Sequence, residues 1–354
     1  METRLLSILA GIVLGLLWIP VSCPCQAGSL PLIVDHRSTN IDIIPAKWIE
    51  KAKQDLVIAY GHTSHGSQLV SGMSVLAAQD DLFAFNSTGS GGALKLIDHA
   101  FSGDLGHNGD TSWASRTRDF LDRPENSDVN MVMWSWCGGV SDNTREGINT
   151  YLNTMSALEQ EYPHVTFVYM TGHLDGTGLE GNLHARNEQI REFCRTHGKV
   201  LFDFADIESF DPDGNSFLEK YANDGCYYDS DGDGSRDANW AQQWCSAHPG
   251  ECSTVGCAHS QSLNCDLKGR AVWWMLARLA GWNPGSAGLG DVNGDGDITI
   301  VDALFVARCA VGLSDLCQAS VADVDCNHQL DIRDALLIAR RSVDLPTANW
   351  CSTD

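Results

Sequence analysis

The chain has 354 residues, of which 43% are apolar and 19% are charged, a composition typical of a globular protein rather than a collagenous or low-complexity one. Asp and Glu number 46 against 23 Lys and Arg, which gives a net charge of −23. We expect no nucleic-acid partner, because a protein that follows a phosphate backbone needs the opposite charge. The carboxylates suit an exported protein or one that binds Ca²⁺, a cation that prefers oxygen ligands.

The N-terminal segment has the layout of a secretory signal peptide. Arg4 precedes an apolar run from Leu5 to Pro20, and small residues follow near Ala27. We therefore expect residues 1–27 to be removed on export, leaving an extracellular protein with no membrane contact. An uncleaved anchor is the alternative, because the apolar run is nearly long enough to span a bilayer.

Alternating strand and helix patterns follow the signal peptide. Apolar runs rich in β-branched and aromatic residues predict buried parallel strands, and apolar residues at three- and four-residue spacing predict helices. The predicted strands are residues 56–60, 129–136, 165–171 and 200–204, and the predicted helices are residues 143–161, 182–197 and 267–282. The alternation predicts a three-layer α/β domain over residues 28–282, with its ligand site at the carboxyl ends of the strands.

The first of these strands runs into the segment Gly61-His62-Thr63-Ser64-His65-Gly66. A serine at such a strand end is a candidate nucleophile, because glycine lets the backbone turn sharply and a following helix offers N–H groups to an oxyanion. The spacing differs from the G-x-S-x-G elbow of the α/β-hydrolases. A helix N-cap is the structural alternative for Ser64.

The segment resembles the SGNH (GDSL-type) hydrolase superfamily, some branches of which carry H-x-S-x-G after the first strand, here His62, Ser64 and Gly66. The resemblance implies a flavodoxin-like α/β/α fold with a parallel sheet and a serine esterase activity in which Ser64 is the nucleophile. In this family a second sequence block provides a glycine N–H that donates to the oxyanion. The segment around Gly109 resembles that block, which implies that Gly109 is such a donor. His259, shortly before the last helix of the domain, matches the late histidine that acts as base.

Two departures from the family pattern affect the site. No asparagine occupies residues 134–139, where the third block is expected, so Ser135, Cys137 or the backbone amide of Gly138 must replace it. Gly256 stands where an Asp normally precedes the histidine, and we expect Asp175 to orient the imidazole instead. The residues expected to contact substrate are His62, His65, Trp136 and Gly138.

Other chemistries remain open for the same region. Four histidines near strand ends could bind a metal in a metal-dependent hydrolase, namely His62, His65, His107 and His173. A glycoside hydrolase would need a carboxylate pair, for which the candidates are Asp203, Asp206 and Glu208. A non-catalytic carbohydrate-binding module is the third alternative.

Two of the thirteen cysteines lie in the signal peptide, and the eleven that remain in the exported chain predict disulfides. Five of them fall between residues 226 and 265, which we predict to be a stapled segment, with a zinc site as the alternative. Seven cysteines lie between the signal and residue 282, and because that number is odd, one is expected to be free or to pair elsewhere.

Within residues 226–265, the residues Asp229, Asp231 and Asp233 have the spacing of a Ca²⁺ loop. An Asx-rich solvated turn is the alternative, because Trp240 occupies position 12.

A linker at residues 283–289 precedes an internal repeat with a period of 32 residues in the segment 290–354. Each copy reads as a Ca²⁺ loop followed by a helix. The candidate ligands are Asp291, Asn293, Asp295, Asp297 and Asp302 in the first copy, and Asp323, Asp325, Asn327 and Asp334 in the second. His328 replaces the glycine of the second turn, so we expect strain there or a weaker site.

A closing Asp with one helix per loop, in two copies, resembles the type I dockerin domain. The resemblance implies two bound Ca²⁺ ions and docking onto a cohesin domain of a scaffold or cell-surface protein, as in a cellulosome. A calcium-stabilised unit without a partner is the alternative. Together with the first domain, this predicts a secreted carbohydrate esterase that removes acyl groups from a polysaccharide substrate, an inference of substrate by association.

Overall fold

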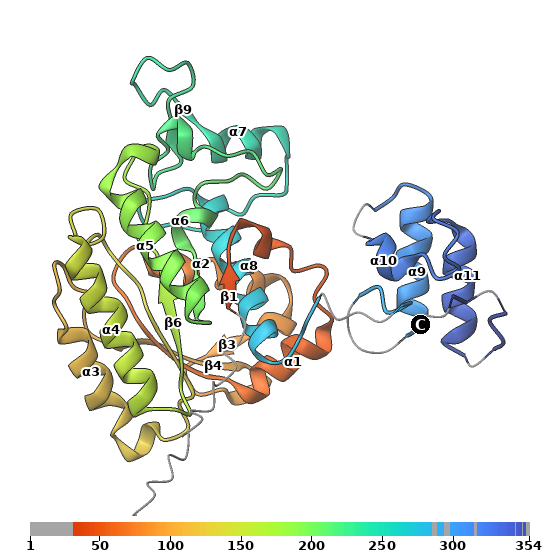
Figure 1. Cartoon of the computed structure of the whole chain (residues 1–354), viewed down its shortest axis with the longest axis horizontal. Coiled ribbons are helices and arrows are strands. Elements are labelled where there is room, and N and C mark those ends of the chain that lie inside the picture. The colour runs from red at the N-terminus through yellow and green to blue at the C-terminus, as the bar shows by residue number, and fades with distance from the viewer. Residues whose placement is uncertain are drawn as a thin grey trace, which may run out of the picture.

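A computed structural model describes residues 31–284, 289–293, 298–314, 317–343, 345–348 and 350–351 of the chain. The expected signal peptide and the candidate ligands Asp295 and Asp297 lie outside these residues. Figure 1 shows an α/β domain followed by a small helical unit.

The α/β domain is built on a seven-stranded sheet in the order β1-β7-β6-β5-β2-β4-β3, and every neighbouring pair is parallel. The strands are β1 (Leu32–Val34), β2 (Val57–Gly61), β3 (Phe85–Asn86), β4 (Leu94–Phe101), β5 (Met131–Trp134), β6 (Thr166–Met170) and β7 (Val200–Phe202). The central order β4-β2-β5-β6-β7 is the flavodoxin-like one. The predicted α/β fold with a parallel sheet is confirmed.

Helices cover both faces of the sheet, which gives three layers (Figure 1). One face carries α1 (Ala46–Asp55), α2 (Ser67–Gln79) and α8 (Ser262–Leu279), and the other carries α3 (Ser112–Leu121), α4 (Arg145–Glu161) and α5 (Asn182–Thr196). Helices α2 and α8 cross at a glycine pair. A Cβ on Gly72 would lie 1.8 Å from the carbonyl oxygen of Cys265, and one on Gly269 would lie 2.2 Å from the carbonyl carbon of Gly72. Only glycine allows the two backbones to come this close.

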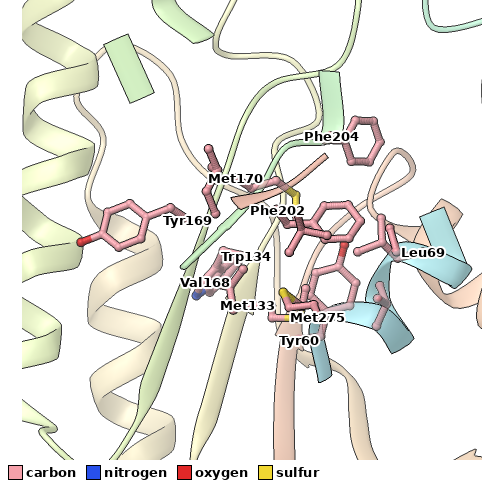
Figure 2. Packing of buried hydrophobic residues seen from close by; sticks show 14 of the residues in the cluster. Tyr60, Leu69, Met133, Trp134, Val168, Tyr169, Met170, Phe202, Phe204 and Met275 are labelled. Atoms are coloured by element: carbon pink, nitrogen blue, oxygen red, sulfur yellow. The ribbon is translucent and has the colours of Figure 1, made fainter. Parts of the chain in front are cut away.

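The core lies between the sheet and these helices. The central strands are buried on both faces, as expected of a parallel sheet, and alternate residues point to opposite layers. Figure 2 shows Tyr60 and Phe202 on the side of Met275 in α8, whereas Tyr169 points to the opposite side of the sheet. Burial of these aromatic side chains from several strands supplies the main driving force for the fold.

The segment between β7 and α8, residues 203–261, completes the domain. It contains α6 (Phe204–Ile207), α7 (Trp240–Ala247) and the hairpin of β8 (Tyr227–Tyr228) and β9 (Ala238–Asn239). Disulfides join Cys245 to Cys252 and Cys257 to Cys265, so the predicted stapling is confirmed there. Cys226 is a buried free thiol, and the free cysteines of the described residues also include Cys137 and Cys194.

The helical unit consists of α9 (Ile300–Ala310), α10 (Ala319–Ala322) and α11 (Ile332–Arg341) around a small apolar core of its own, centred on Val306, Val324 and Ile338. Disulfides Cys309–Cys317 and Cys326–Cys351 tie its loops. Among the described helices of the whole chain, none is long and apolar enough to cross a membrane.

Candidate active site and calcium loops

The strand order places a topological switch point at the carboxyl ends of β2 and β5, the kind of position at which open α/β sheets form a ligand crevice. Strand β2 lies between β4 and β5, so the chain leaves β2 toward one side of the sheet and later returns to the other. Ligands of open α/β sheets bind at such a switch point. Ser64 follows β2 and Cys137 follows β5, so both lie at this edge.

Close packing of Gly66 fixes the turn that carries Ser64. A Cβ on Gly66 would lie 2.1 Å from Ser135 Oγ and 2.3 Å from His62 Cβ, so a larger residue could not lie against the end of β5. The Tyr60 hydroxyl donates a hydrogen bond of 3.0 Å to the Gly66 carbonyl. Helix α2 starts one residue later. The N–H groups of its first three residues donate to carbonyls of the turn, Ser67 to Thr63 and Ser64, Gln68 to His65, and Leu69 to Gly66.

Ser64 and His259 form a nucleophile–base pair. The distance between Ser64 Oγ and His259 Nε2 is 2.9 Å, although the residues are 195 positions apart in the chain. His259 has a left-handed backbone conformation with φ of 62°, and the Gln68 side chain holds the loop by donating to the Ala258 carbonyl at 2.5 Å. Ser64 makes its side-chain contacts here and with Cys137, and helix α2 has no side-chain N-cap bond, so the N-cap alternative is wrong.

A second chain of contacts runs through His65. Its Nδ1 lies 3.3 Å from Cys137 Sγ, and its Nε2 lies 3.1 Å from Asp224 Oδ2. The ring stacks on His173 with a centroid distance of 3.7 Å and on His259 with one of 4.4 Å. His65 therefore joins the two halves of the site. Its side chain is 7% exposed, and its expected contact with substrate stays a prediction.

Electrostatics favour a charged pair at these groups. Burial disfavours the charged form of His65, but the hydrogen bonds to Asp224 and Cys137 outweigh it and raise the pKa of His65. Burial likewise disfavours the Cys137 thiolate, but hydrogen bonds from His65, Ser64 and Thr63 lower the pKa of Cys137 to about 6. Burial lowers the pKa of the neighbouring His173, whose ring Nδ1 donates to the Leu174 carbonyl at 3.0 Å.

The carboxylate next to the imidazoles is Asp224 and not Asp175. Asp175 Oδ1 accepts hydrogen bonds from the backbone N–H and the hydroxyl of Thr177, at 2.9 and 2.6 Å, in a local turn. Single ligand atoms of Asp224, His65 and His259 all lie within 4.8 Å of one another. The expected role of Asp175 is therefore wrong in this structure. Sequence spacing could not reveal Asp224, because it lies in a long irregular segment before β8.

Two residues expected to contact substrate are buried instead. The His62 side chain has no exposed surface, and its ring nitrogens face the Thr63 carbonyl at 2.8 Å and Asp98 Oδ1 at 2.6 Å. Trp136 is 2% exposed and donates its indole N–H to the Met170 carbonyl at 3.0 Å. Both expectations are wrong, because the side chains at these strand ends complete the core.

The expected walls of the oxyanion site are only partly assembled. Gly109 packs against Gly147 and Thr150 of α4, so its role as a donor stays a prediction. Gly138 adopts a φ of 94° that favours glycine and lies beside His107, and its role also stays a prediction. Ser135 Oγ is buried under Gly66, which leaves Cys137 as the side chain of that strand end that contacts Ser64.

The four histidines expected for a metal-dependent alternative divide among separate contacts. His62 pairs with Asp98, His107 with Asp142, and His65 stacks on His173. Among the described residues, His62 could hold a metal together with Asp98 and His99. His65 could do so with Asp224 and His259, which are part of the site described above.

The carboxylates considered for glycoside hydrolysis have structural partners. Asp203 makes a bidentate bond to Arg191 at 2.6 and 2.7 Å, and Asp206 contacts the ring of His36 at 2.5 Å. Glu208 is fully buried and pairs with Lys268. These contacts disfavour the glycosidase alternative for this set, because a general acid or base must reach the substrate.

The buried Lys268 connects the residues that pack behind the site. Its Nζ lies 2.6 Å from Glu208 Oε1, contacts Gln68 Oε1 and sits over the ring of Phe204. Glu208 Oε2 in turn accepts the N–H of Leu174 at 2.8 Å. The network links α2, α8 and the segment that carries His173. The sequence signal for this network is a lysine within an otherwise apolar helix pattern, because a buried lysine needs a buried partner.

Both repeats of the helical unit form carboxylate loops. Asp302 is fully buried and accepts N–H groups of Val292, Asn293 and Thr299, while Asp334 does the same for Val324 and Asp331. In the second loop, single oxygens of Asp323, Asp325 and Asp334 lie within 4.8 Å of one another. Asp291 is buried in the first loop, and the Asn327 amide donates to Asp325.

His328 and the loop in the larger domain complete the acidic sites. His328 has a φ of 65°, the left-handed conformation expected of the glycine that it replaces, which residues with a side chain rarely adopt. Strain or a weaker site there stays a prediction. Asp229 is buried and accepts from the N–H groups of Gly232 and Gly234, and its carboxylate gathers with those of Asp231 and Asp233. Calcium binding there stays a prediction.

The comparisons with known proteins identify the helical unit. No curated protein and no solved structure matches the chain. Residues 289–341 match the family model described as the Dockerin type I domain. This region is therefore a type I dockerin domain, which implies calcium binding and attachment to a cohesin partner.

Proposed function

We propose that the protein is a secreted serine hydrolase of carboxylic esters that is attached to a cohesin-bearing scaffold or cell surface through its dockerin. The contact between Ser64 Oγ and His259 Nε2 at 2.9 Å carries the proposal. A hydroxyl in direct contact with an imidazole at the switch point of a parallel sheet has the geometry that nucleophilic catalysis requires.

In this mechanism Ser64 Oγ attacks the ester carbonyl while His259 Nε2 takes its proton. His259 then returns the proton to the leaving alcohol, and water repeats the sequence on the acyl-enzyme. The negative charge of the tetrahedral intermediate would be stabilised by N–H groups of the turn before α2 and, as a prediction, by Gly109. Asp224 and the stacked His65 hold the imidazole of His259 in position.

The dockerin favours an acylated polysaccharide as substrate. Its helices α9 and α11 present apolar side chains at equivalent positions of the two repeats, Leu304 at 60% exposure and Leu336 at 59%, together with Ile300 and Ile332. Exposed apolar side chains on adjacent helices suit a protein interface, and a cohesin is the partner that the domain implies. A scaffold would hold the esterase next to other enzymes that act on the same polymer.

Hydrolysis of p-nitrophenyl acetate and of acetylated xylan tests the proposal, with the mature protein, Ser64→Ala and Ser74→Ala as the matched control. Ser74 lies on the exposed side of α2 and bonds only to the Val70 carbonyl. We expect Ser64→Ala to lose at least about 10⁴-fold in kcat and Ser74→Ala to keep full activity. Ester hydrolysis at the wild-type rate in Ser64→Ala contradicts the proposal. Loss of wild-type activity on addition of a chelator would assign the His65–Asp224–His259 group to a metal or show that Ca²⁺ holds the fold.

A further inference from the structure

The free thiols of the described chain differ sharply in their surroundings. Cys194 and Cys226 are buried, and burial raises the pKa of both, to about 12 for Cys226. Cys137 is half-buried in the crevice after β5, with its sulfur 3.1 Å from Ser64 Oγ. A thiol with this placement is accessible to a ligand that reaches Ser64.

A base and a carboxylate stand in line behind this sulfur. His65 Nδ1 lies 3.3 Å from Cys137 Sγ, and His65 Nε2 lies 3.1 Å from Asp224 Oδ2. The order of thiol, imidazole and carboxylate is that of a nucleophile, its base and the group that orients the base. Because the ring is nearly buried and stacks on His173, it has little freedom to leave this position.

The turn before α2 surrounds the sulfur with hydrogen-bond donors. The hydroxyls of Ser64 and Thr63, the ring of His65 and the His65 backbone N–H all act on it. Together they lower the pKa of the thiol to about 6 against the opposing effect of burial, and the pKa of His65 is raised. Both shifts favour the thiolate–imidazolium pair, the reactive form of a cysteine nucleophile.

We propose that Cys137, with His65 as its acid and base and Asp224 as the residue that orients His65, is a second nucleophile of the crevice that accepts acyl groups from carboxylic esters as a thioester. The inference rests on the geometry of these three residues and does not require Ser64 to be catalytic.

The reaction balances with water as the only co-substrate. The thiolate attacks the carbonyl carbon, the C–S bond forms, the ester C–O bond breaks, and the alkoxide takes a proton from the His65 imidazolium to leave as an alcohol. Water then gives a proton to neutral His65 and its oxygen bonds to the acyl carbon. The C–S bond breaks, the carboxylic acid leaves, and the thiolate–imidazolium pair is restored.

Alkylation by iodoacetamide between pH 4.5 and 9, read by peptide mass spectrometry, tests the first half of the proposal. Cys194 and Cys226 serve as internal controls. We expect Cys137 to label with a midpoint near pH 6, and His65→Gln and Asp224→Asn to move that midpoint up by about one unit or more. A midpoint near 8.5 in the wild type, or no movement in His65→Gln, overturns the assignment of His65 and Asp224.

Acyl transfer is tested by brief exposure of Ser64→Ala to p-nitrophenyl acetate, an acid quench and intact-mass analysis. We expect one acetyl group that neutral hydroxylamine removes, as it does from a thioester, and none in Ser64→Ala/Cys137→Ala. No acetyl group on Cys137 in Ser64→Ala overturns the proposal. If wild type shows an acetyl-serine in that case, the serine esterase stands alone. If Cys137→Ala abolishes turnover and Ser64→Ala does not, the thiol is the nucleophile and the serine proposal fails instead.

Discussion

Ser64 Oγ and Cys137 Sγ lie 3.1 Å apart at the ends of two adjacent strands, and the Ser64 hydroxyl has a single proton to donate. His259 Nε2 at 2.9 Å competes for that proton. A thiolate accepts a hydrogen bond more strongly than a thiol, so ionisation of Cys137 draws the Ser64 proton away from its base. The two nucleophiles of the crevice are therefore coupled through one hydrogen bond.

Removing Cys137 should make Ser64 more reactive, and increasingly so as pH rises. Because the pKa of Cys137 is lowered to about 6, the sulfur is a thiol at pH 5 and a thiolate at pH 8. We expect Cys137→Ala to react with a fluorophosphonate probe at Ser64 at nearly the wild-type rate at pH 5 and roughly tenfold faster at pH 8, the worth of a hydrogen bond to a charged group. A rate ratio between variant and wild type that stays constant from pH 5 to pH 8 contradicts this coupling.

Asp224→Asn should impair ester hydrolysis far more than Asp175→Asn. Asp224 bonds to His65, and the ring of His259 stacks on His65. Burial raises the pKa of Asp224, but the hydrogen bond from His65 and the nearby His173 outweigh burial and lower it. We expect at least about a tenfold loss of kcat for Asp224→Asn, because an amide cannot stabilise the imidazolium in the same way. Asp175→Asn should keep wild-type kinetics, since the Asp175 carboxylate accepts its hydrogen bonds from Thr177 in a local turn and Asn can replace it there. Equal losses in the two variants would return Asp175 to the site.

Much of the sheet could be predicted from the sequence, since a parallel strand buried on both faces needs a continuous apolar run. The predicted strand at 56–60 corresponds to β2 and that at 165–171 to β6. Strand β4, LKLIDHAF, was missed because Lys95, Asp98 and His99 interrupt its apolar run. The two-residue β3 is too short to carry a pattern.

The contact between Ser64 and His259 could also be predicted from the sequence, because each residue lies in a short recognisable motif. The contacts of Asp224 and Cys137 depend on how an irregular segment folds back over the sheet, which no local pattern encodes. The prediction for Trp136 was wrong because an aromatic residue at a strand end can either stack on a sugar or pack into the core, and the sequence does not distinguish the two; the side chain is buried.

Lys268→Met should destabilise the α/β domain strongly. The Lys268 and Glu208 side chains are both fully buried, so the variant leaves an unpaired carboxylate in the core. We expect a loss of about 3 to 5 kcal/mol in the free energy of unfolding, measured by urea denaturation with excess Ca²⁺. Lys268→Met/Glu208→Gln is the matched control. It removes both charges and keeps an acceptor for the Leu174 N–H, so it should recover most of the loss; no recovery would show that packing over Phe204 matters more than charge.

His328→Gly should stabilise the second calcium loop. A residue with a side chain pays about 1 to 2 kcal/mol in the left-handed region, and His328 adopts it with a φ of 65° so that its N–H can reach Asp323 Oδ2 at 2.9 Å. Glycine removes this strain but gains freedom in the unfolded chain, so we expect a net gain of about 0.5 to 1 kcal/mol. Hydrogen exchange of α11 in the full chain with saturating Ca²⁺ measures it.

Gln329→Gly is the control for that substitution, because Gln329 is the next residue and has no left-handed backbone. We expect it to be neutral or destabilising, since it adds unfolded-state freedom without relieving strain. Chelation should remove protection from α11 in all three proteins, because the carboxylates of Asp323, Asp325 and Asp334 repel one another without a cation. Slower exchange in Gln329→Gly than in His328→Gly would show that the imidazole, and not the backbone angle, supports the loop.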